Sequence, residues 1–456
     1  MKIKEISVTG LFGVFDRIIP LNMDEKITII HAPNGFGKTI ILKILHGLFN
    51  SNYFVFWNIL FNSFTVTFDN NYQVKVIKEF ELISDHFFLN QKTKIGKINV
   101  NFYDSKMKQI EAWDLSKSSI THARHELPDS IEEIEKMIPY VKRIGRDEWK
   151  DIVTGEFLSF NEVLDRFWDF SSFPTLKIVE PQWFLNLKKV VCIHLVESQR
   201  LLDISATKDS SISPTVSACS RELASYIQAK LTDYGTVSQS LDRTFPARVV
   251  KRKLLPNVAE EKLLQQLDEL ENNRFRLIEV GLLDEDEEAA FEIPSRTLDD
   301  STKQILSVYI EDTKEKLNVF NDIANKIYFL KTIINKKFKS SHKKMIIDKE
   351  SGFVFTIPYF ESDGYSETYL QPRDLSSGEQ HEIVLLYELL FKVKPNSLVL
   401  IDEPEISLHV GWQVDFLKDL QEITKLVDID ILIATHSPDI IHDRWDLTVE
   451  LQGVKA

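Results

Sequence analysis

The chain has 456 residues, of which 43% are hydrophobic and 27% are charged, and it contains only 15 glycines and 15 prolines. This composition is ordinary for a globular protein and excludes collagen-like, low-complexity and disordered classes. The formal net charge of −14 argues against non-specific coating of long nucleic acid. Two cysteines, Cys192 and Cys219, cannot build a disulfide framework, and no apolar run is long enough to span a bilayer. We therefore expect a cytoplasmic protein that is neither secreted nor embedded in a membrane.

Residues 1–115 predict a series of strands and one helix. The β-branched run Lys26–Ile30 is typical of a buried strand. It leads directly into His31–Thr39, and an apolar helix follows from Ile40. The segment between strand and helix fits the phosphate-loop pattern G-x-x-x-x-G-K-S/T, except that Ala32 stands where the first glycine is usual. Because alanine is nearly as small as glycine, the pattern still predicts nucleotide binding.

The chemistry of a phosphate loop explains these residue types. Small residues let backbone N–H groups face phosphate oxygens, and the lysine supplies positive charge to the β- and γ-phosphates. The threonine hydroxyl binds Mg²⁺. The residues expected to contact the nucleotide are Asn34, Gly35, Phe36, Gly37, Lys38 and Thr39.

Residues 116–185 have a less regular pattern. We expect a helix over 129–141, and we interpret 116–185 as a helical insert. An apolar strand is predicted over Lys188–Leu195, and the polar sequence Glu197–Arg200 follows it.

Residues 213–340 are predicted to be mostly helical. Apolar residues recur in steps of three and four between Ile310 and Ile327, which is typical of a coiled-coil seam, and leucines between Leu263 and Leu277 have a similar spacing. The acidic run Asp284–Glu288 separates the two patterns. We interpret this region as two short antiparallel arms around an acidic tip. A compact helical insert with an ordinary amphipathic face is the alternative.

The C-terminal part of the chain contains three further motifs. Leu375–Glu379 opens a helix, and a serine-rich helix start offers free N–H groups to an anion. An apolar strand ends in Asp402 and Glu403, which predicts a magnesium ligand followed by a general base. A second apolar strand delivers His436 at its end.

Each motif has an ordinary structural explanation when it is taken alone, but their order is specific. A phosphate loop, a serine-rich helix start, an Asp-Glu strand and a histidine strand, in this order, resemble the ATP-binding-cassette (ABC) class of P-loop ATPases. The resemblance implies a head-to-tail homo-oligomer with ATP and Mg²⁺ sandwiched between heads. Ser376 and Gly378 would then contact the γ-phosphate bound to Lys38 of the other subunit. The signature segment as a whole comprises Leu375, Ser376, Ser377, Gly378 and Glu379.

The same resemblance implies further roles for single residues. His436 would be the switch histidine that senses the γ-phosphate, and Glu403 would be the catalytic base. The loop Ile406–His409 would cross the head–head interface. Such ATPases also have a glutamine that follows a strand of the first lobe and contacts Mg²⁺, and Gln199 is our candidate. Gln73 and Gln91 fit less well, because the first lies inside a predicted strand and the second in a polar turn.

Most of the chain lies between Thr39 and Ser376, which resembles the SMC-like branch rather than transporter subunits. The expected fold is α/β: an ABC-type ATPase head of two lobes, interrupted by a helical insert and a short antiparallel coiled-coil arm. The predicted domains are ATPase lobe I with the phosphate loop (1–115), the helical insert (116–185), a lobe I strand with the candidate glutamine (186–212), the helical or coiled-coil arm (213–340) and ATPase lobe II (341–456).

Within that branch the motifs resemble ATPases of the overcoming-lysogenization-defect family and their antiphage relatives. The residues behind this are His31–Thr39, Ser198–Leu201, Leu375–Gln380 and Ala434–Pro438. AriA ATPases of PARIS systems are the most similar group, and PtuA ATPases of Septu systems come second. The resemblance implies an ATPase sensor or scaffold that holds a separate effector nuclease, Toprim-type or alternatively HNH, and releases it when a viral trigger protein appears.

The sequence ends shortly after His436, so we expect the nuclease to be a separate polypeptide and the chain itself to have no nuclease activity. No membrane contact is expected. The alternative function is an SMC-like or RecF-like DNA-repair ATPase that engages DNA. A lysine-rich run over 336–344 could hold a phosphodiester backbone, although such runs are usually solvated surface.

Overall fold

The computed structural model describes residues 1–53, 55–83, 92–115, 141–145, 148–151, 156–159, 163, 178–196, 202–203, 213–251, 260–284, 298–361, 364–406 and 408–451. The chain divides into two compact units. The first comprises Met1–Gln199, Ile204–Ile212 and Val393–Ala456, and the second comprises Arg200–Asp203 and Ser213–Lys392. Both units contain strands as well as helices, which confirms the predicted α/β class. The C-terminal division falls at Val393, whereas the sequence analysis began lobe II at residue 341.

The first unit contains a five-stranded parallel sheet. Its strand order is β11 (Ile193–Val196), β17 (Leu398–Asp402), β18 (Asp430–Thr435), β3 (Ile27–His31) and β19 (Thr448–Glu450). The three central strands are almost completely buried, as their apolar runs predict. Since parallel strands end at the same edge of a sheet, the residues after β3, β17 and β18 lie side by side.

A six-stranded antiparallel sheet forms a second layer of this unit. Its order is β2 (Phe15–Pro20), β1 (Ile3–Leu11), β4 (Ser63–Phe68), β5 (Gln73–Ile83), β6 (Lys92–Tyr103) and β7 (Gln109–Asp114). The described residues of this unit also form five α-helices: α1 (Lys38–Phe49), α2 (Val55–Asn58), α6 (Gln182–Val190), α12 (Val410–Val427) and α13 (Pro438–Ile441).

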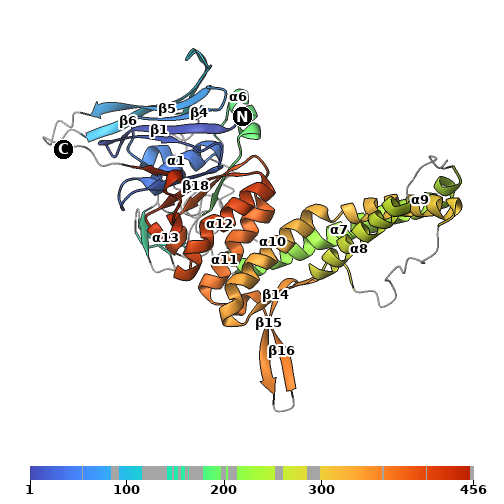
Figure 1. The fold of residues 1–456 in the computed structure, drawn as a ribbon. Helices are drawn as coiled ribbons and strands as arrows, with labels where there is room; N and C mark the ends of the chain where they lie inside the picture. The colour runs from blue at the N-terminus through green and yellow to red at the C-terminus, as the bar shows by residue number, and fades with distance from the viewer. Residues whose placement is uncertain are drawn as a thin grey trace. The chain divides into compact units, whose positions relative to one another are not determined.

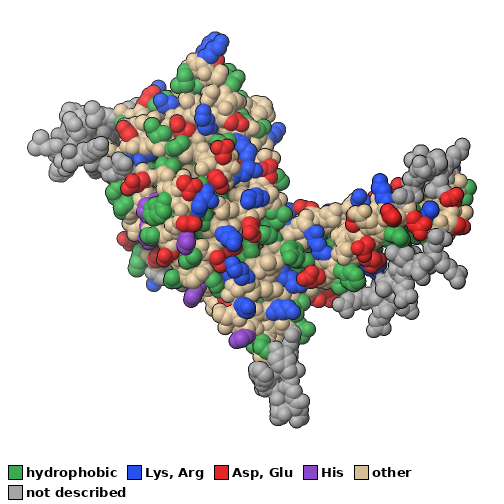
Figure 2. All heavy atoms as spheres, in the orientation of Figure 1, with side chains coloured by type: hydrophobic (Ala, Val, Ile, Leu, Met, Phe, Trp, Pro, Cys, Tyr) green, Lys and Arg blue, Asp and Glu red, His purple; other side chains and the backbone are tan. Residues whose placement is uncertain are grey.

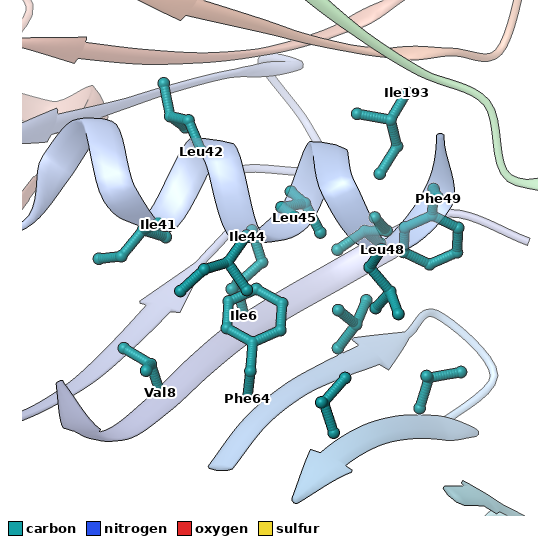
Figure 3. Close-up of a cluster of buried hydrophobic side chains, with 14 of the residues drawn as sticks. Ile6, Val8, Ile41, Leu42, Ile44, Leu45, Leu48, Phe49, Phe64 and Ile193 are labelled. Atoms are coloured by element: carbon teal, nitrogen blue, oxygen red, sulfur yellow. The ribbon is translucent and has the colours of Figure 1, made fainter. Parts of the chain in front are cut away.

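Helix α1 packs between the two sheets. Figure 3 shows Ile44 on the side of Phe64 from the antiparallel sheet, whereas Leu42 points to the opposite side, where Ile193 of the parallel sheet lies. All four side chains are buried in one apolar cluster. A helix with apolar residues on both faces is expected to lie inside a protein, and this burial fixes α1 and the loop before it.

The predicted helical insert differs from the structure. The described residues of 141–159 form a small antiparallel sheet of β8 (Val141–Arg143), β9 (Glu148–Asp151) and β10 (Phe157–Ser159), so this part is not helical. The helix predicted over 129–141 lies outside the described residues, apart from Val141, which begins β8. The strand predicted over Lys188–Leu195 is also partly wrong. Residues 188–190 end helix α6 (Gln182–Val190), whose Phe184 and Leu187 are buried one helical turn apart, and the strand begins at Ile193.

Helices form most of the second unit (Figure 1). They are α7 (Thr215–Lys251), α8 (Glu260–Glu279), α9 (Asp300–Asn318) and α10 (Asn321–Lys337). Helix α9 packs against both α7 and α8. Arg248 of α7 pairs with Asp312 of α9, and Lys303 of α9 pairs with Glu260 of α8. The spaced leucines of α8 and the seam residues Ile310 and Ile327 are buried, so the spacing correctly located the packed faces. The four leucines are Leu263, Leu267, Leu270 and Leu277.

The path of the chain differs from two arms around an acidic tip. Since Lys303 meets Glu260, helices α8 and α9 begin at the same end of the bundle. Among the described residues, three passes along the bundle are helical: α7 runs out, α8 runs back, and α9 with α10 also runs back. Asp284 follows the end of α8 and pairs with Lys349 beside strand β14 (Lys344–Asp348), which places the start of the acidic run away from the far end. Residues 285–288 lie outside the described ranges.

A three-stranded antiparallel sheet completes this unit with β14, β15 (Gly352–Glu361) and β16 (Gly364–Leu370), followed by helix α11 (Ser377–Tyr387). Ser220 of α7 binds the sheet through the carbonyl oxygens of Ser351 and Phe353. Gly352 has a φ of 84°, and a Cβ atom there would lie 1.9 Å from the Ser220 carbonyl oxygen, so this approach requires glycine. Within the described residues, no helix is long and apolar enough to cross a membrane.

Candidate functional site

The predicted phosphate loop lies between β3 and α1, as expected. Gly35 and Gly37 have φ values of 84° and 87°, a backbone conformation that favours glycine. A Cβ atom at Gly37 would lie 2.6 Å from Leu11, whereas the space beside Gly35 is open. The first hydrogen bond of α1 runs from the Ile41 N–H group to the Gly37 carbonyl oxygen, so the preceding N–H groups can receive an anion.

Lys38 is buried at the start of α1. Its Nζ donates hydrogen bonds to the carbonyl oxygens of Ala32 and Pro33, at 2.7 and 3.2 Å. The Ala32 side chain is itself buried in the apolar core, so the structure accommodates the departure from the usual glycine. The Lys38 ammonium group thus donates to two neutral carbonyl oxygens, and negatively charged phosphate oxygens could accept these hydrogen bonds in their place.

Asp402 ends β17 directly beside the loop. Its Oδ1 accepts a hydrogen bond from Thr39 Oγ1 at 3.0 Å. Burial raises the pKa of Asp402 to about 6, and the nearby carboxylates of Glu403 and Glu405 contribute to the rise, although the Thr39 hydrogen bond opposes it. A half-buried carboxylate next to a hydroxyl, in a negative surrounding, suits a divalent cation with oxygen ligands. Thr39 and Asp402 would hold Mg²⁺, while the third predicted ligand, Gln199, lies outside the described residues.

Glu403 follows Asp402 at a sharp turn of the backbone. Its φ is 43°, and its N–H group donates to the Ala434 carbonyl oxygen at 2.8 Å. Glu403 Oε1 lies 3.8 Å from Nδ1 of His436, whose side chain is 43% exposed. The predicted base and the predicted switch histidine therefore meet at the edge where β17 and β18 end.

One acidic residue of this edge escaped the sequence analysis. Glu405 Oε1 lies 3.0 Å from His436 Nδ1, closer than Glu403. The same oxygen accepts hydrogen bonds from the Thr435 hydroxyl and from the His436 N–H group. The sequence contains no signal for this contact, because an acid shortly after an Asp-Glu pair can equally face solvent.

Aromatic rings flank the loop and were also missed. The rings of Phe15 and Phe36 stack with centroids 5.8 Å apart, and Phe12 meets Phe15 edge to face. The Arg17 guanidinium lies 4.4 Å from the Phe15 ring centre. Such a planar apolar surface suits a nucleobase. Phe36 was predicted as a nucleotide contact of the loop, whereas Phe12 lies in the turn between β1 and β2 and Phe15 begins β2.

The signature segment belongs to the second unit. Ser376 caps α11, where its hydroxyl accepts from the Glu379 N–H group and the Glu379 carboxylate in turn accepts from the Ser376 N–H group. Lys343 forms an ion pair with Glu379 at 2.7 Å. Burial acts to raise the pKa of Glu379, but the hydrogen bonds from Lys343 and Ser376 hold it below its usual value. Leu375 and Glu379 are buried, so they support the helix start, while Ser376 and Ser377 are exposed and Gly378 is partly exposed.

The structure thus brings Lys38, Thr39, Asp402, Glu403 and His436 together in the first unit. Among the residues that the structure describes, no group of three or more His, Cys, Asp or Glu side chains is placed to hold a metal on its own. Proteins commonly bind Mg²⁺ through one or two side chains together with nucleotide phosphates, and Thr39 with Asp402 fits that mode.

A family model for the AAA ATPase domain matches residues 1–441. The chain belongs to this family. The match includes the phosphate loop, Asp402, Glu403 and His436, so the predicted ATPase class agrees with the family.

Other comparisons give weaker likenesses. The chain is 27% identical over 178 residues to the Retron Ec83 probable ATPase of Escherichia coli, a match that covers 34% of this chain and 29% of that protein. Solved structures of SMC head domains from Pyrococcus furiosus and Thermotoga maritima align over 96% and 97% of this chain and 91% of each of theirs. Their sequence identities are 13% and 11%, with TM-scores of 0.29 and 0.30. TM-scores this low do not establish a common fold, and the fold assignment rests on the strand and helix order of the chain itself.

Proposed function

We propose that the chain is the ATP-hydrolysing subunit of an antiviral defence system, in which it holds a separate toxic effector. The observation that carries the ATPase part is the contact between Thr39 and Asp402, with Glu403 and His436 beside it. Membership in the AAA ATPase domain family supports the same chemistry.

Each residue of the site has its own role in hydrolysis. Loop N–H groups and Lys38 bind the β- and γ-phosphates, and Thr39 and Asp402 hold Mg²⁺, which neutralises phosphate charge when it is bound. Glu403 accepts a proton from the attacking water, and its partial exposure leaves room for that water. His436 donates to the γ-phosphate from Nε2 when both of its ring nitrogens carry a proton. Ser376 of the partner subunit completes the site.

The defensive role rests on resemblance. The relative from Escherichia coli is described as a retron ATPase, and the motifs are similar to AriA ATPases, with PtuA ATPases as the second choice. We propose that ATP-bridged heads form a homo-oligomer that keeps a Toprim-type or HNH nuclease inactive. A viral protein would release the nuclease by changing this assembly.

Two experiments test the proposal. The purified chain should release phosphate from ATP in the presence of Mg²⁺ and should cleave neither DNA nor RNA, whereas an Asp402→Asn variant should release almost no phosphate. Cells that express the chain alone should remain sensitive to phage, and protection should appear only when a partner nuclease is added. Protection or nucleic-acid cleavage by the chain alone would contradict the two-component proposal.

The DNA-repair alternative depends on the lysine-rich run over 336–344. Two of its lysines are engaged within the second unit: Lys337 pairs with Glu382, and Lys343 pairs with Glu379. On the face drawn in Figure 2, basic and acidic side chains are interspersed rather than segregated. Both observations favour the defence proposal over DNA binding. Salt-dependent binding of the purified chain to duplex DNA would reverse that preference.

A further inference from the structure

We propose that Glu405 is a positioning residue for His436. Its carboxylate holds the imidazole ring in one tautomer and one orientation, so that Glu403 remains free to act as the base. This inference rests on the proposed ATPase function and adds a residue to the same site.

Three donors converge on one oxygen of Glu405. Thr435 Oγ1 lies 2.7 Å from Oε1, and the N–H group and Nδ1 of His436 both lie 3.0 Å from it. The Glu405 side chain is only 7% exposed, in contrast to the half-exposed histidine ring. Among the described residues, the second oxygen, Oε2, is buried with no hydrogen-bond partner. The carboxylate is therefore aimed at the end of β18 through a single oxygen.

This geometry fixes the proton on the ring. An ionised carboxylate only accepts hydrogen bonds, so a 3.0 Å contact requires His436 Nδ1 to carry the hydrogen. Nε2 lies on the opposite side of the imidazole ring and is the nitrogen left for the nucleotide. In the neutral Nδ1–H tautomer it is an acceptor, and it donates to a phosphate oxygen only when the ring carries a second proton. Carboxylates that fix a functional histidine in this way are common around metal sites and catalytic sites.

The distances also separate the roles of the two acids. Glu403 Oε1 lies 3.8 Å from Nδ1, which is beyond a hydrogen bond. Because Glu405 satisfies the ring nitrogen, Glu403 does not need to do so. Its carboxylate is then available to accept a proton from water.

A buried glutamine of helix α12 contacts the backbone of Glu405 but not its carboxylate. Gln413 Nε2 donates to the carbonyl oxygens of Glu405 and Leu408, and its Oε1 accepts from the Ser437 hydroxyl. Gln413 thus supports the same segment without touching the histidine ring, which makes it a matched control.

A double-mutant cycle tests the inference. We expect Glu405→Ala to lower kcat about 10-fold or more with little change in ATP affinity, a loss typical of removing such a supporting group. In a His436→Ala background the same substitution should cause no further loss, because its effect passes through the ring. Glu405→Gln should retain most of the activity, since its amide oxygen can accept the same hydrogen bonds. Gln413→Ala should change kcat far less than Glu405→Ala.

A second readout does not depend on activity. In the ¹⁵N spectrum of labelled histidine, wild-type His436 should be the Nδ1–H tautomer, and Glu405→Ala should lose that preference. A wild-type Nε2–H tautomer would overturn the inference. An equal loss of kcat from Glu405→Ala in the presence and in the absence of His436 would also overturn it. So would a loss of kcat in Gln413→Ala as large as that in Glu405→Ala. A wild-type chain that hydrolyses no ATP would instead refute the proposed function, and the nitrogen spectrum would still decide the role of Glu405.

Discussion

Two ionisable residues of the site, Lys38 and Asp402, have side chains that are buried or half-buried in the protein. Lys38 is 4% exposed and donates to two uncharged carbonyl oxygens of its own loop, and burial raises the pKa of Asp402. Keeping either side chain charged costs more free energy when protein alone surrounds it than when the lysine contacts a phosphate or the aspartate contacts a cation. Nucleotide and Mg²⁺ should therefore stabilise the protein on binding.

Lys38→Ala should weaken ATP binding by about 100-fold, because it removes the buried cation that faces the phosphates. Isothermal titration calorimetry measures this affinity directly. Lys75→Ala, which alters a partly exposed lysine of β5 in the same unit, serves as the control and should bind ATP normally. Equal affinities for Lys38→Ala and the control would show that the loop does not bind phosphate through Lys38.

Lys78 provides a prediction about pH and stability. It is 5% exposed, its Nζ lies 4.0 Å from the Phe61 ring centre, and burial lowers its pKa to about 7. The folded protein therefore releases this proton near pH 7, whereas the unfolded chain keeps it to about pH 10.5, so the free energy of unfolding should rise with pH between these values.

Lys78→Met should remove that rise and increase the free energy of unfolding at pH 7 by roughly 1–3 kcal/mol. Urea denaturation at a series of pH values would show both effects. Lys75→Met on the same strand should leave the pH dependence intact. An unchanged slope in Lys78→Met would mean that this lysine is already protonated at equal cost in both states.

At the scale of helices and strands, one ion pair joins α10 to α11. It is the most deeply buried ion pair among the described residues of the second unit. Lys337 and Glu382 have side chains that are 3% and 0% exposed. Helix α11 begins at the signature serine, and Lys343 contacts its capping residue Glu379 as well. The orientation of the signature segment thus depends on the end of α10.

Removing one partner of this pair should be more damaging than removing both. We expect Lys337→Met to cost about 3–5 kcal/mol of unfolding free energy, because it leaves a buried carboxylate without its cation. The double variant Lys337→Met, Glu382→Leu should recover much of this loss. Chemical denaturation of the two proteins would compare them, and a double variant less stable than the single one would contradict the explanation.

The predictability of the elements follows from what each pattern encodes. Spacings of three and four between Ile310 and Ile327 correctly indicated a buried helix face, and the β-branched run at Lys26 correctly indicated a buried strand. The spacing of apolar residues along one helix does not show which other helix packs against it. The sequence analysis therefore expected two helical arms, and the third helical pass along the bundle was missed. The short strands β8–β10 lack a strong alternation, and their small sheet was therefore not predicted.

The same limit applies to the site. The phosphate loop, Asp402 and His436 were predictable because each is part of a local motif. Glu405 and Phe15 meet the site from other segments of the chain, and only the packing around β18 and at the start of β2 shows their contacts.

At the scale of the whole molecule, the two halves of the predicted ATP site belong to different compact units. Lys38 and Asp402 lie in the first unit, and Ser376 lies in the second. A site shared between subunits predicts that two different defects can complement each other. The proposed homo-oligomer can therefore be tested without knowing its effector.

Lys38→Ala and Ser376→Arg should each be inactive alone, and a mixture of the two should regain part of the ATPase activity. The hybrid interface would combine an intact phosphate loop from one protein with an intact signature segment from the other. Phosphate release by the mixture, with differently tagged subunits to confirm their exchange, measures the effect. Mixed subunits without any recovered activity would argue against the shared site.

The central claim is that this edge of the parallel sheet hydrolyses ATP with Glu403 as the base. Phosphate release by Glu403→Gln, compared with wild type at saturating ATP and Mg²⁺, tests it most directly. The account predicts turnover reduced by about 100-fold or more with ATP binding preserved, because the water loses its base while Lys38, Thr39 and Asp402 remain. Turnover at the wild-type rate would contradict it.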